Sequence, residues 1–222
     1  MDFFKNDLCT SILTNCNWNC EYCIAKDNSK IIDEEKIFEY VKSIQNELNY
    51  LFLSGGEPGL LSEDFWDKVF NLTNKRLLIA SNGTFIKNQY LKKYAKHIKI
   101  LMIHPVPELD QSIPQYILDI IPFCKYHNVD LWFEIVIHKF NIDLLKPFLL
   151  KYPNIHFILS FTDYFYKKNS NENYRYCIGK EEALQLIHII KEFPEYSEKL
   201  TLLMLSILRN DFTYLNSWSK LA

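Results

Sequence analysis

What the sequence lacks excludes several classes of protein. Its formal charge is −2 at pH 7, so it has no surplus of basic residues of the kind that nucleic-acid binding requires. No apolar run approaches the ~18 residues of a membrane-spanning helix. Residues 1–5 show no basic stretch followed by an apolar one, as a secretory signal would. We therefore expect a cytoplasmic protein that binds neither nucleic acid nor membranes.

A fourth clustered cysteine is also missing. Cys16, Cys20 and Cys23 fall within eight residues, and no second cysteine pair follows at similar spacing. Clustered cysteines in a reducing compartment favour metal or redox chemistry over disulfides. A [4Fe–4S] cluster normally takes four thiolates, so three would leave one iron open to a ligand that is not protein. A zinc site that adds an outside ligand such as His104 is the alternative, although zinc loops usually bring a second pair.

Apolar strand-like runs alternate with helical patterns over much of the chain. The predicted strands cover residues 8–14, 50–54, 77–81, 98–103, 129–137 and 155–161. Helices are predicted between them, with Asp33 and Ser62 as N-caps of two and a start at Ser112 or Ile113 for another. Such alternation implies parallel strands with right-handed crossovers. The chain is shorter than the ~250 residues of an eight-unit barrel, so we predict an α/β fold, a partial (β/α)6 TIM-like barrel with a short C-terminal appendage.

The alternation weakens after residue 161. We predict a barrel core over residues 1–161, followed by a C-terminal segment over residues 162–222 that is not an independent domain. This segment begins with a tyrosine-rich stretch that contains Cys177, and a helix is predicted over residues 180–193. Because it follows the sixth strand, it would leave from the active-site end and serve as a substrate-side lid with a packing helix.

Residues with chemical potential follow the predicted strands, and parallel barrels carry their chemistry at the carboxyl ends of strands. The cysteine loop, Gly55-Gly56-Glu57-Pro58, Ser81-Asn82 and His104 all lie at such ends. Two adjacent glycines allow the backbone to approach a ligand closely. Glu134 lies within an otherwise apolar strand and needs a partner, for which a ligand hydroxyl is a candidate.

The cysteine loop and the Gly55-Gly56-Glu57-Pro58 stretch together resemble the radical S-adenosylmethionine (SAM) superfamily, over roughly residues 7–160. The resemblance implies that Cys16, Cys20 and Cys23 hold a [4Fe–4S] cluster, and that SAM binds the open iron through its amino and carboxylate groups. It implies that the glycine-rich stretch binds the amino group of SAM, mainly through backbone carbonyls, with Glu57 supporting it.

The resemblance assigns SAM contacts to further residues. Tyr22, before the third cysteine, would pack near the adenine, and Glu134 would reach the ribose. Ser81-Asn82 would lie beneath SAM, although a simple Asn-Gly turn explains them equally well. His104 departs from the family pattern, in which a serine followed by an acidic residue is common here. It could contact SAM, act on the substrate or merely pack.

The activity that the resemblance implies is reductive cleavage of SAM to a 5′-deoxyadenosyl radical, which abstracts hydrogen from a small-molecule or peptide substrate. Flavodoxin or ferredoxin would supply the electron. Cys177 would either donate a hydrogen atom to a substrate radical, as in some family epimerases, or be an ordinary loop cysteine. The competing class is a non-enzymatic metal-binding or scaffold protein whose cysteine loop holds zinc or a structural cluster.

Overall fold

The computed structural model of the chain describes residues 8–23, 28, 30–46, 51–72, 77–161 and 176–193. The described strands are β1 (Leu8–Leu13), β2 (Leu51–Gly55), β3 (Leu77–Ser81), β4 (Ile98–Ile103), β5 (Asp130–Ile137) and β6 (Phe157–Phe161). The α-helices are α1 (Glu34–Ile44), α2 (Glu63–Leu72), α3 (Thr84–Lys87), α4 (Tyr90–Tyr94), α5 (Gln115–Leu118), α6 (Ile120–Tyr126), α7 (Ile142–Lys151) and α8 (Lys180–Ile190). Two 3₁₀ turns, η1 (Pro58–Leu60) and η2 (Ala95–His97), complete the set.

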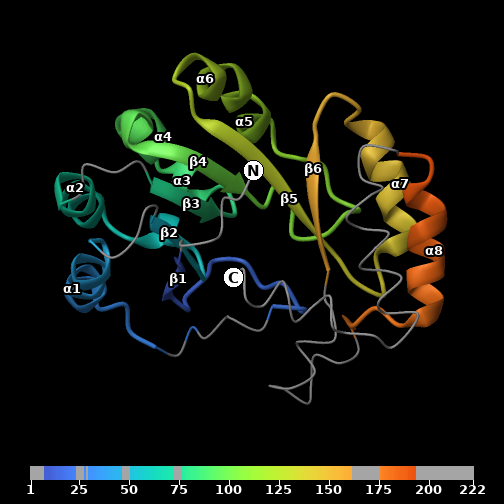
Figure 1. Cartoon of the computed structure of the whole chain (residues 1–222), viewed down its shortest axis with the longest axis horizontal. Coiled ribbons are helices and arrows are strands. Elements are labelled where there is room, and N and C mark those ends of the chain that lie inside the picture. The colour runs from blue at the N-terminus through green and yellow to red at the C-terminus, as the bar shows by residue number, and fades with distance from the viewer. Residues whose placement is uncertain are drawn as a thin grey trace. The chain divides into compact units, whose positions relative to one another are not determined.

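The six strands form one sheet in the order of the sequence, β1 to β6. The pairs β1–β2, β2–β3, β3–β4 and β4–β5 are parallel. Parallel neighbours need a crossover between them, usually a helix, and α1, α2 and α4 lie along one side of β1 to β4 (Figure 1). The predicted α/β class and the partial barrel of six units are confirmed.

By its contacts the chain divides into two compact units. The first comprises Met1–Pro107, Gln111–Glu134 and His156–Ile158, and the second comprises Glu108–Asp110, Ile135–Ile155 and Leu159–Ala222. The predicted boundary at residue 161 stays a prediction. Most of the tyrosine-rich stretch, and an apolar run over residues 200–208, lie outside the described residues. In the described part of the chain, no helix combines the length and the apolar character needed to cross a membrane.

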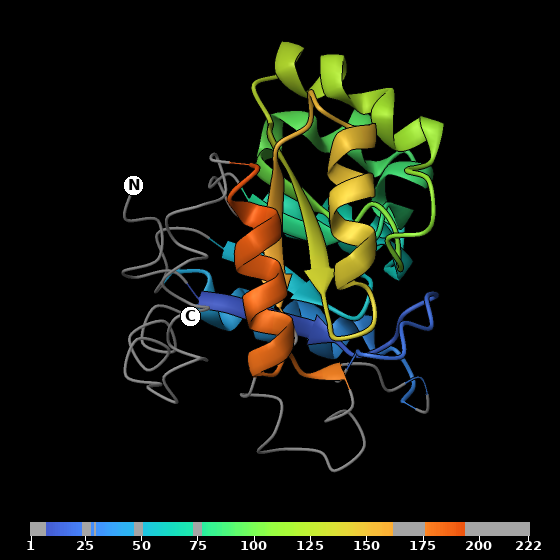
Figure 2. The same ribbon diagram turned by 90° about the vertical axis from the view of Figure 1, so that its right-hand side faces the viewer.

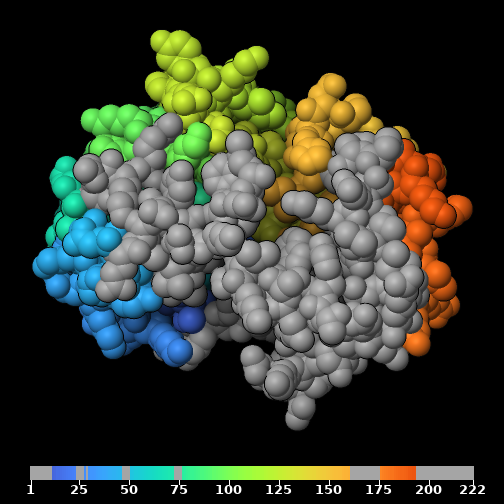
Figure 3. Space-filling view, in the orientation of Figure 1, coloured from blue at the N-terminus to red at the C-terminus, as the bar shows by residue number. Residues whose placement is uncertain are grey.

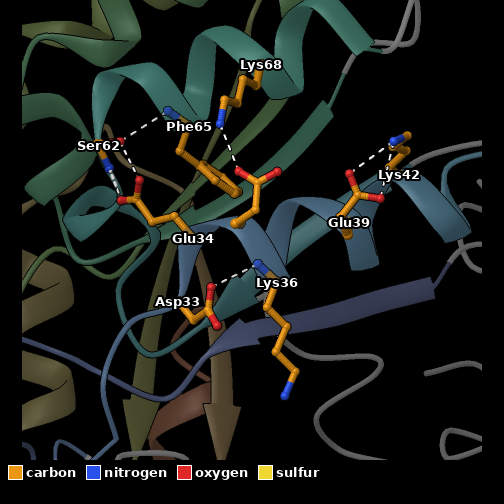
Figure 4. Close-up of polar contacts among 9 residues, drawn as sticks. Asp33, Glu34, Lys36, Glu39, Lys42, Ser62, Phe65 and Lys68 are labelled. Atoms are coloured by element: carbon orange, nitrogen blue, oxygen red, sulfur yellow. Dashed lines mark hydrogen bonds and ion pairs between the residues drawn. The ribbon is translucent and has the colours of Figure 1, made fainter.

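The two predicted N-caps of the first unit are confirmed. Asp33 accepts a hydrogen bond from the backbone N–H of Lys36 at 3.1 Å, and Ser62 Oγ accepts one from the N–H of Phe65 at 3.2 Å (Figure 4). Glu34, in the first turn of α1, accepts from both the N–H and the hydroxyl of Ser62, at 2.6 and 2.5 Å. These bonds satisfy donors that a helix start leaves open, and they join the starts of α1 and α2.

The core of the first unit lies where strands and helices meet. Fully buried aliphatic residues lie on β2 and β3, among them Leu51, Leu53, Leu77 and Ile79. Trp66 of α2 is also fully buried, and its ring packs edge-to-face against Phe85 at 5.1 Å between centroids. Burial of this apolar surface is the main stabilisation of such a layered fold.

One predicted helix differs from the structure. The helix expected from residue 112 or 113 begins only after Pro114, and it is divided into α5 and α6. A proline disfavours the helical conformation at the residue before it, which delays the start. Of the apolar residues of α5 and α6, Ile117, Ile120 and Cys124 are buried, but Ile121 is 38% exposed, because it lies at the edge of the apolar stripe.

In the second unit, α7 and α8 lie side by side, yellow and orange in Figures 1 and 2. Lys146 of α7 pairs with Glu192, just after α8, at 2.6 Å. The buried side of α8 includes Ala183, Leu186 and Ile190. Its outer side is part of the molecular surface, orange to red in Figure 3. The start of α8 at Lys180 agrees with the prediction.

Candidate functional site

The cysteine loop leaves the carboxyl end of β1, as predicted. Cys16, Cys20 and Cys23 are free thiols of intermediate exposure. The side chain of Asn28 holds the backbone of Cys16 from both sides: it accepts from the Cys16 N–H at 2.8 Å and donates to the Cys16 carbonyl at 3.0 Å. The Cys23 N–H donates to the Cys20 carbonyl at 3.2 Å, which closes a turn between the second and third cysteines.

The thiol of Cys16 receives two N–H groups. The backbone N–H of Trp18 lies 3.4 Å from its sulfur, and the side-chain amide of Asn82 lies 3.6 Å from it. Burial, as the largest cause, raises the pKa of this thiol above its ordinary value, and the two hydrogen bonds oppose that rise. Since metals bind the thiolate, the positive charge of a metal would be needed to hold Cys16 ionised at neutral pH.

The thiols of the loop and the N–H groups around them are suited to a metal site. Within the ranges that the structure describes, no three His, Cys, Asp or Glu side chains are gathered around one point as ligands of a single ion. In a [4Fe–4S] cluster, by contrast, each cysteine binds a different iron, and N–H groups directed at the sulfurs are typical. The three thiols and the two N–H donors of this loop fit such a cluster.

The glycines after β2 allow a close approach of two backbones. A side chain at Gly56 would place its Cβ only 1.9 Å from the carbonyl oxygen of Asn15, at the start of the cysteine loop. The Gly56 N–H donates to the Leu13 carbonyl and the Glu57 N–H to the Asn15 carbonyl, both at 2.7 Å. Gly55 has a φ of +126°, which favours glycine. The approach that the structure shows is thus between the end of β2 and the cysteine loop.

Glu57 connects the ends of β2 and β3 from a fully buried position. Its Oε1 accepts from the N–H of Gly59 at 2.6 Å and from the hydroxyl of Ser81 at 2.8 Å, and its Oε2 accepts from the N–H of Asn82 at 2.6 Å. Burial raises the pKa of this carboxyl above its ordinary value, while the three hydrogen bonds act in the opposite direction. Pro58 follows at the first position of η1.

The hydroxyl of Ser81 is already saturated. It donates to Glu57 and accepts from the N–H groups of Gly83 and Phe85, at 3.0 and 3.2 Å. A hydroxyl has one donor and two acceptor positions, so this one has no capacity left for SAM in the observed arrangement. Gly83 has a φ of +96° and precedes α3, so the predicted Asn-Gly turn is present.

Asn82 connects that turn to the cysteine loop. Its Oδ1 accepts from the N–H and the hydroxyl of Thr84, at 3.1 and 2.7 Å. Its Nδ2 donates to Asn17 Oδ1 at 2.9 Å as well as to Cys16, and Asn17 in turn donates to the Thr84 hydroxyl at 2.9 Å. Sequence reasoning missed Asn17 and Thr84. Their position beside a predicted ligand and a predicted turn was the only signal in the sequence.

Two further predicted residues meet across β4 and β5. The Nδ1 of His104 lies 3.3 Å from Glu134 Oε2, and the two side chains are 25% and 22% exposed. The backbone N–H of His104 donates to the Ser81 carbonyl at 2.9 Å, which extends the β3–β4 ladder beyond β4. Glu134, the charged residue within β5, therefore has His104 as a partner inside the protein.

Tyr22 is buried, with 8% of its surface exposed. Its hydroxyl donates to the Pro107 carbonyl at 3.1 Å, so the cysteine loop is also joined to the segment that follows β4. The cysteines and every residue predicted to bind SAM belong to the first unit.

Cys177 belongs to the second unit and has intermediate exposure. The carbonyl of its neighbour Tyr176 accepts from the N–H of Lys139 at 3.0 Å. The Tyr176 ring packs edge-to-face on His138, whose Nε2 lies 3.0 Å from Glu108 Oε2. No pattern in the sequence predicted the pairing of His138 with Glu108.

The fold of this chain is similar to that of solved structures. No curated protein matches the chain. The structure resembles that of native anSMEcpe with bound AdoMet, with a TM-score of 0.62 and 16% identity over 84% of this chain and 59% of that chain. It also resembles native anSMEcpe with bound AdoMet and Kp18Cys peptide, with a TM-score of 0.60, 16% identity and the same two coverages. This chain thus spans under two thirds of those proteins, and at such identities the likeness shows the fold.

The family is shown by the sequence itself. The model of the radical SAM superfamily matches residues 10–144, which is more than half of the chain and includes the cysteine loop, the glycine-rich stretch, His104 and Glu134. Enzymes of this superfamily use a [4Fe–4S] cluster together with SAM, and the three thiols and two N–H···S contacts of the loop fit that cluster. The chain therefore belongs to the radical S-adenosylmethionine superfamily.

Proposed function

We propose that this enzyme holds its [4Fe–4S] cluster on Cys16, Cys20 and Cys23 and acts on a C–H bond of a peptide or a small molecule. When bound, the cluster and SAM supply a 5′-deoxyadenosyl radical, which abstracts a hydrogen atom from the substrate. The observation that carries the proposal is the bonding of the cysteine loop to two strand ends. The backbone N–H of Glu57, just after β2, donates to the Asn15 carbonyl of the loop, and the side-chain amide of Asn82, just after β3, donates to Cys16.

The same unit offers groups for SAM. The backbone of residues 55–58 supplies carbonyl acceptors, which an ammonium group needs. His104, just after β4, and Glu134, within β5, are both partly exposed, so their side chains can reach the polar part of the cofactor. Tyr22 presents a ring fixed by its bond to Pro107, against which an adenine can pack. Ser81 and Asn82 contribute indirectly, since their side chains are engaged by the protein.

The first substrate class to test is a peptide. The support is the fold of anSMEcpe, which has been observed with a Kp18Cys peptide, although this chain spans only 59% of that structure. We expect a one-electron donor of the flavodoxin or ferredoxin type. We also expect the enzyme to work in the cytoplasm, because a solvent-accessible cluster with an open iron is sensitive to oxygen.

The direct test is anaerobic purification and reconstitution, followed by analysis of iron and sulfide. We expect about four irons per chain and release of 5′-deoxyadenosine from SAM under reductant. Cys20→Ala should lose the cluster. Cys124→Ala, which removes a buried thiol elsewhere in the same unit, should keep it. A colourless protein with stoichiometric zinc would instead support the metal-binding scaffold.

Isotope transfer would identify the substrate. Candidate peptides and small molecules labelled with deuterium should pass the label to 5′-deoxyadenosine only when the labelled position is the one attacked. The same assay tests Cys177 as a hydrogen donor: if Cys177→Ser forms product at the wild-type rate, that role is excluded. An unchanged 5′-deoxyadenosine yield with loss of product would support it.

A further inference from the structure

The side-chain amide of Asn82 is completely engaged inside the first unit. One amide group has two N–H donors and one carbonyl acceptor. The Nδ2 group donates to Asn17 and to Cys16, and Oδ1 accepts twice from Thr84. The residue is 7% exposed, so water competes little for these positions. The amide therefore has no free donor or acceptor for the predicted contact with SAM, and Asn82 must have another role.

The network fixes the direction of the amide. Asn17 comes from the cysteine loop and Thr84 from the first turn of α3, and the two are also bonded to each other at 2.9 Å. The backbone N–H of Asn82 is held separately, by the buried carboxylate of Glu57. Rotation of the amide by half a turn would bring Oδ1 toward Asn17 Oδ1 and the sulfur, so only the observed orientation satisfies all partners. The Nδ2–H is thereby directed at Cys16 Sγ, 3.6 Å away.

An N–H group directed at a cysteine ligand acts on the cluster that the cysteine holds. The positive end of its dipole stabilises negative charge on the sulfur, and reduction of the cluster by one electron increases that charge. The contact is partly buried, so the dipole acts in a lower dielectric than it would in water. The amide should therefore stabilise the reduced state more than the oxidised one.

We propose that Asn82 tunes the cluster: its side-chain amide donates to Cys16 and raises the reduction potential, with Asn17 and Thr84 holding the amide in place. Asn82 is thus a positioning and tuning residue for the electron-transfer step, not a ligand of SAM. The inference rests on the proposed function in one respect, that Cys16 is a cluster ligand.

The test is a redox titration of the reconstituted cluster without SAM, followed by electron paramagnetic resonance, so that the readout does not depend on turnover. Asn82→Leu removes the donor with little change in volume. Asn82→Asp keeps the acceptor for Thr84 but replaces the donor with a carboxylate oxygen. We expect normal iron content in both and a lower equilibrium constant for reduction, by about tenfold, which is about 59 mV more negative for a one-electron couple.

Thr84→Val is the matched control. It removes the hydroxyl that holds Asn82 and Asn17 but leaves the Nδ2–H, so we expect less than half of the shift. An unchanged or more positive potential in Asn82→Leu would overturn the proposal, and so would an equal shift in Thr84→Val. If both Asn82 variants fail to hold iron while Thr84→Val holds it, the residue serves cluster assembly and the tuning role is wrong. A wild-type chain without a cluster would contradict the proposed function instead.

Discussion

Substitution of Gly56 by alanine should dislodge the cysteine loop. The new Cβ would lie 1.9 Å from the Asn15 oxygen and 2.7 Å from the Thr14 carbonyl carbon, all backbone atoms that cannot rotate away. To reach ordinary contact at 3.4 Å, the two segments must separate by about 1.5 Å. That separation also breaks the 2.7 Å bond from the Glu57 N–H to Asn15.

We expect Gly56→Ala to lower the free energy of unfolding by about 3 kcal/mol, from overpacking and the lost hydrogen bond. For a chain of this length, that is a fall of roughly 6–12 °C in melting temperature. Urea unfolding of the iron-free chain measures the first effect, and iron content after anaerobic reconstitution measures displacement of the cysteines. We expect less than half of the wild-type iron.

Gly179→Ala is the matched control. There the added Cβ meets only Glu182 Oε2, at 2.8 Å, which is the end of a flexible side chain that can move. We expect a loss below about 1 kcal/mol and an unchanged iron content. Wild-type stability and iron content in Gly56→Ala would refute the reasoning, because the loop would then not be held by this backbone contact.

Three further predictions concern buried or paired groups. Glu57→Gln would turn an amide NH₂ toward a backbone N–H or the Ser81 hydroxyl, and we expect a loss of about 1–3 kcal/mol in urea unfolding; wild-type stability would contradict the buried network. Glu34→Ala should cost about 1 kcal/mol through its bonds to Ser62, whereas Glu35→Ala, whose pair with Lys68 is exposed, should change stability by less than about 0.5 kcal/mol. Burial raises the pKa of Cys124 to about 12, so iodoacetamide at pH 8 should label it only after denaturation, as mass spectrometry would show. Because the folded thiol keeps its proton while the unfolded one loses it, this residue's stabilisation should decline as the pH rises above 9.

Much of the fold was predictable, because strands and helices follow from local patterns. The strands at residues 77–81 and 98–103 have the predicted bounds, since each is a mainly apolar run that ends before polar or proline residues. Asp33 and Ser62 cap their helices because a short polar side chain just before an amphipathic run can accept a hydrogen bond from an open N–H group of the first turn. The helix after Pro114 was misjudged, since apolar spacing alone does not show where a proline delays a start.

The sequence predicted which residues form the candidate site better than it predicted the hydrogen bonds that those residues make. The spacing of Cys16, Cys20 and Cys23 indicated a cluster because one short loop supplied three soft ligands. Ser81 and Asn82 were predicted to contact SAM, yet their side chains are engaged by Glu57, Cys16 and other protein groups. Nothing in a linear pattern shows whether a polar side chain at a strand end faces a ligand or a neighbouring loop.

By itself, then, the sequence predicted a candidate ligand set, the parallel alternation and the places where glycine is needed, because these depend on residue type and on neighbours along the chain. Only the tertiary structure decided that Asn82 donates to Cys16 and that His104 pairs with Glu134. The members of each pair are separated by many residues. Asn82 and Cys16 meet because parallel strands bring their carboxyl ends to the same edge of a sheet. His104 meets Glu134 because the β4–β5 register places the preceding residues, Ile103 and Phe133, opposite each other.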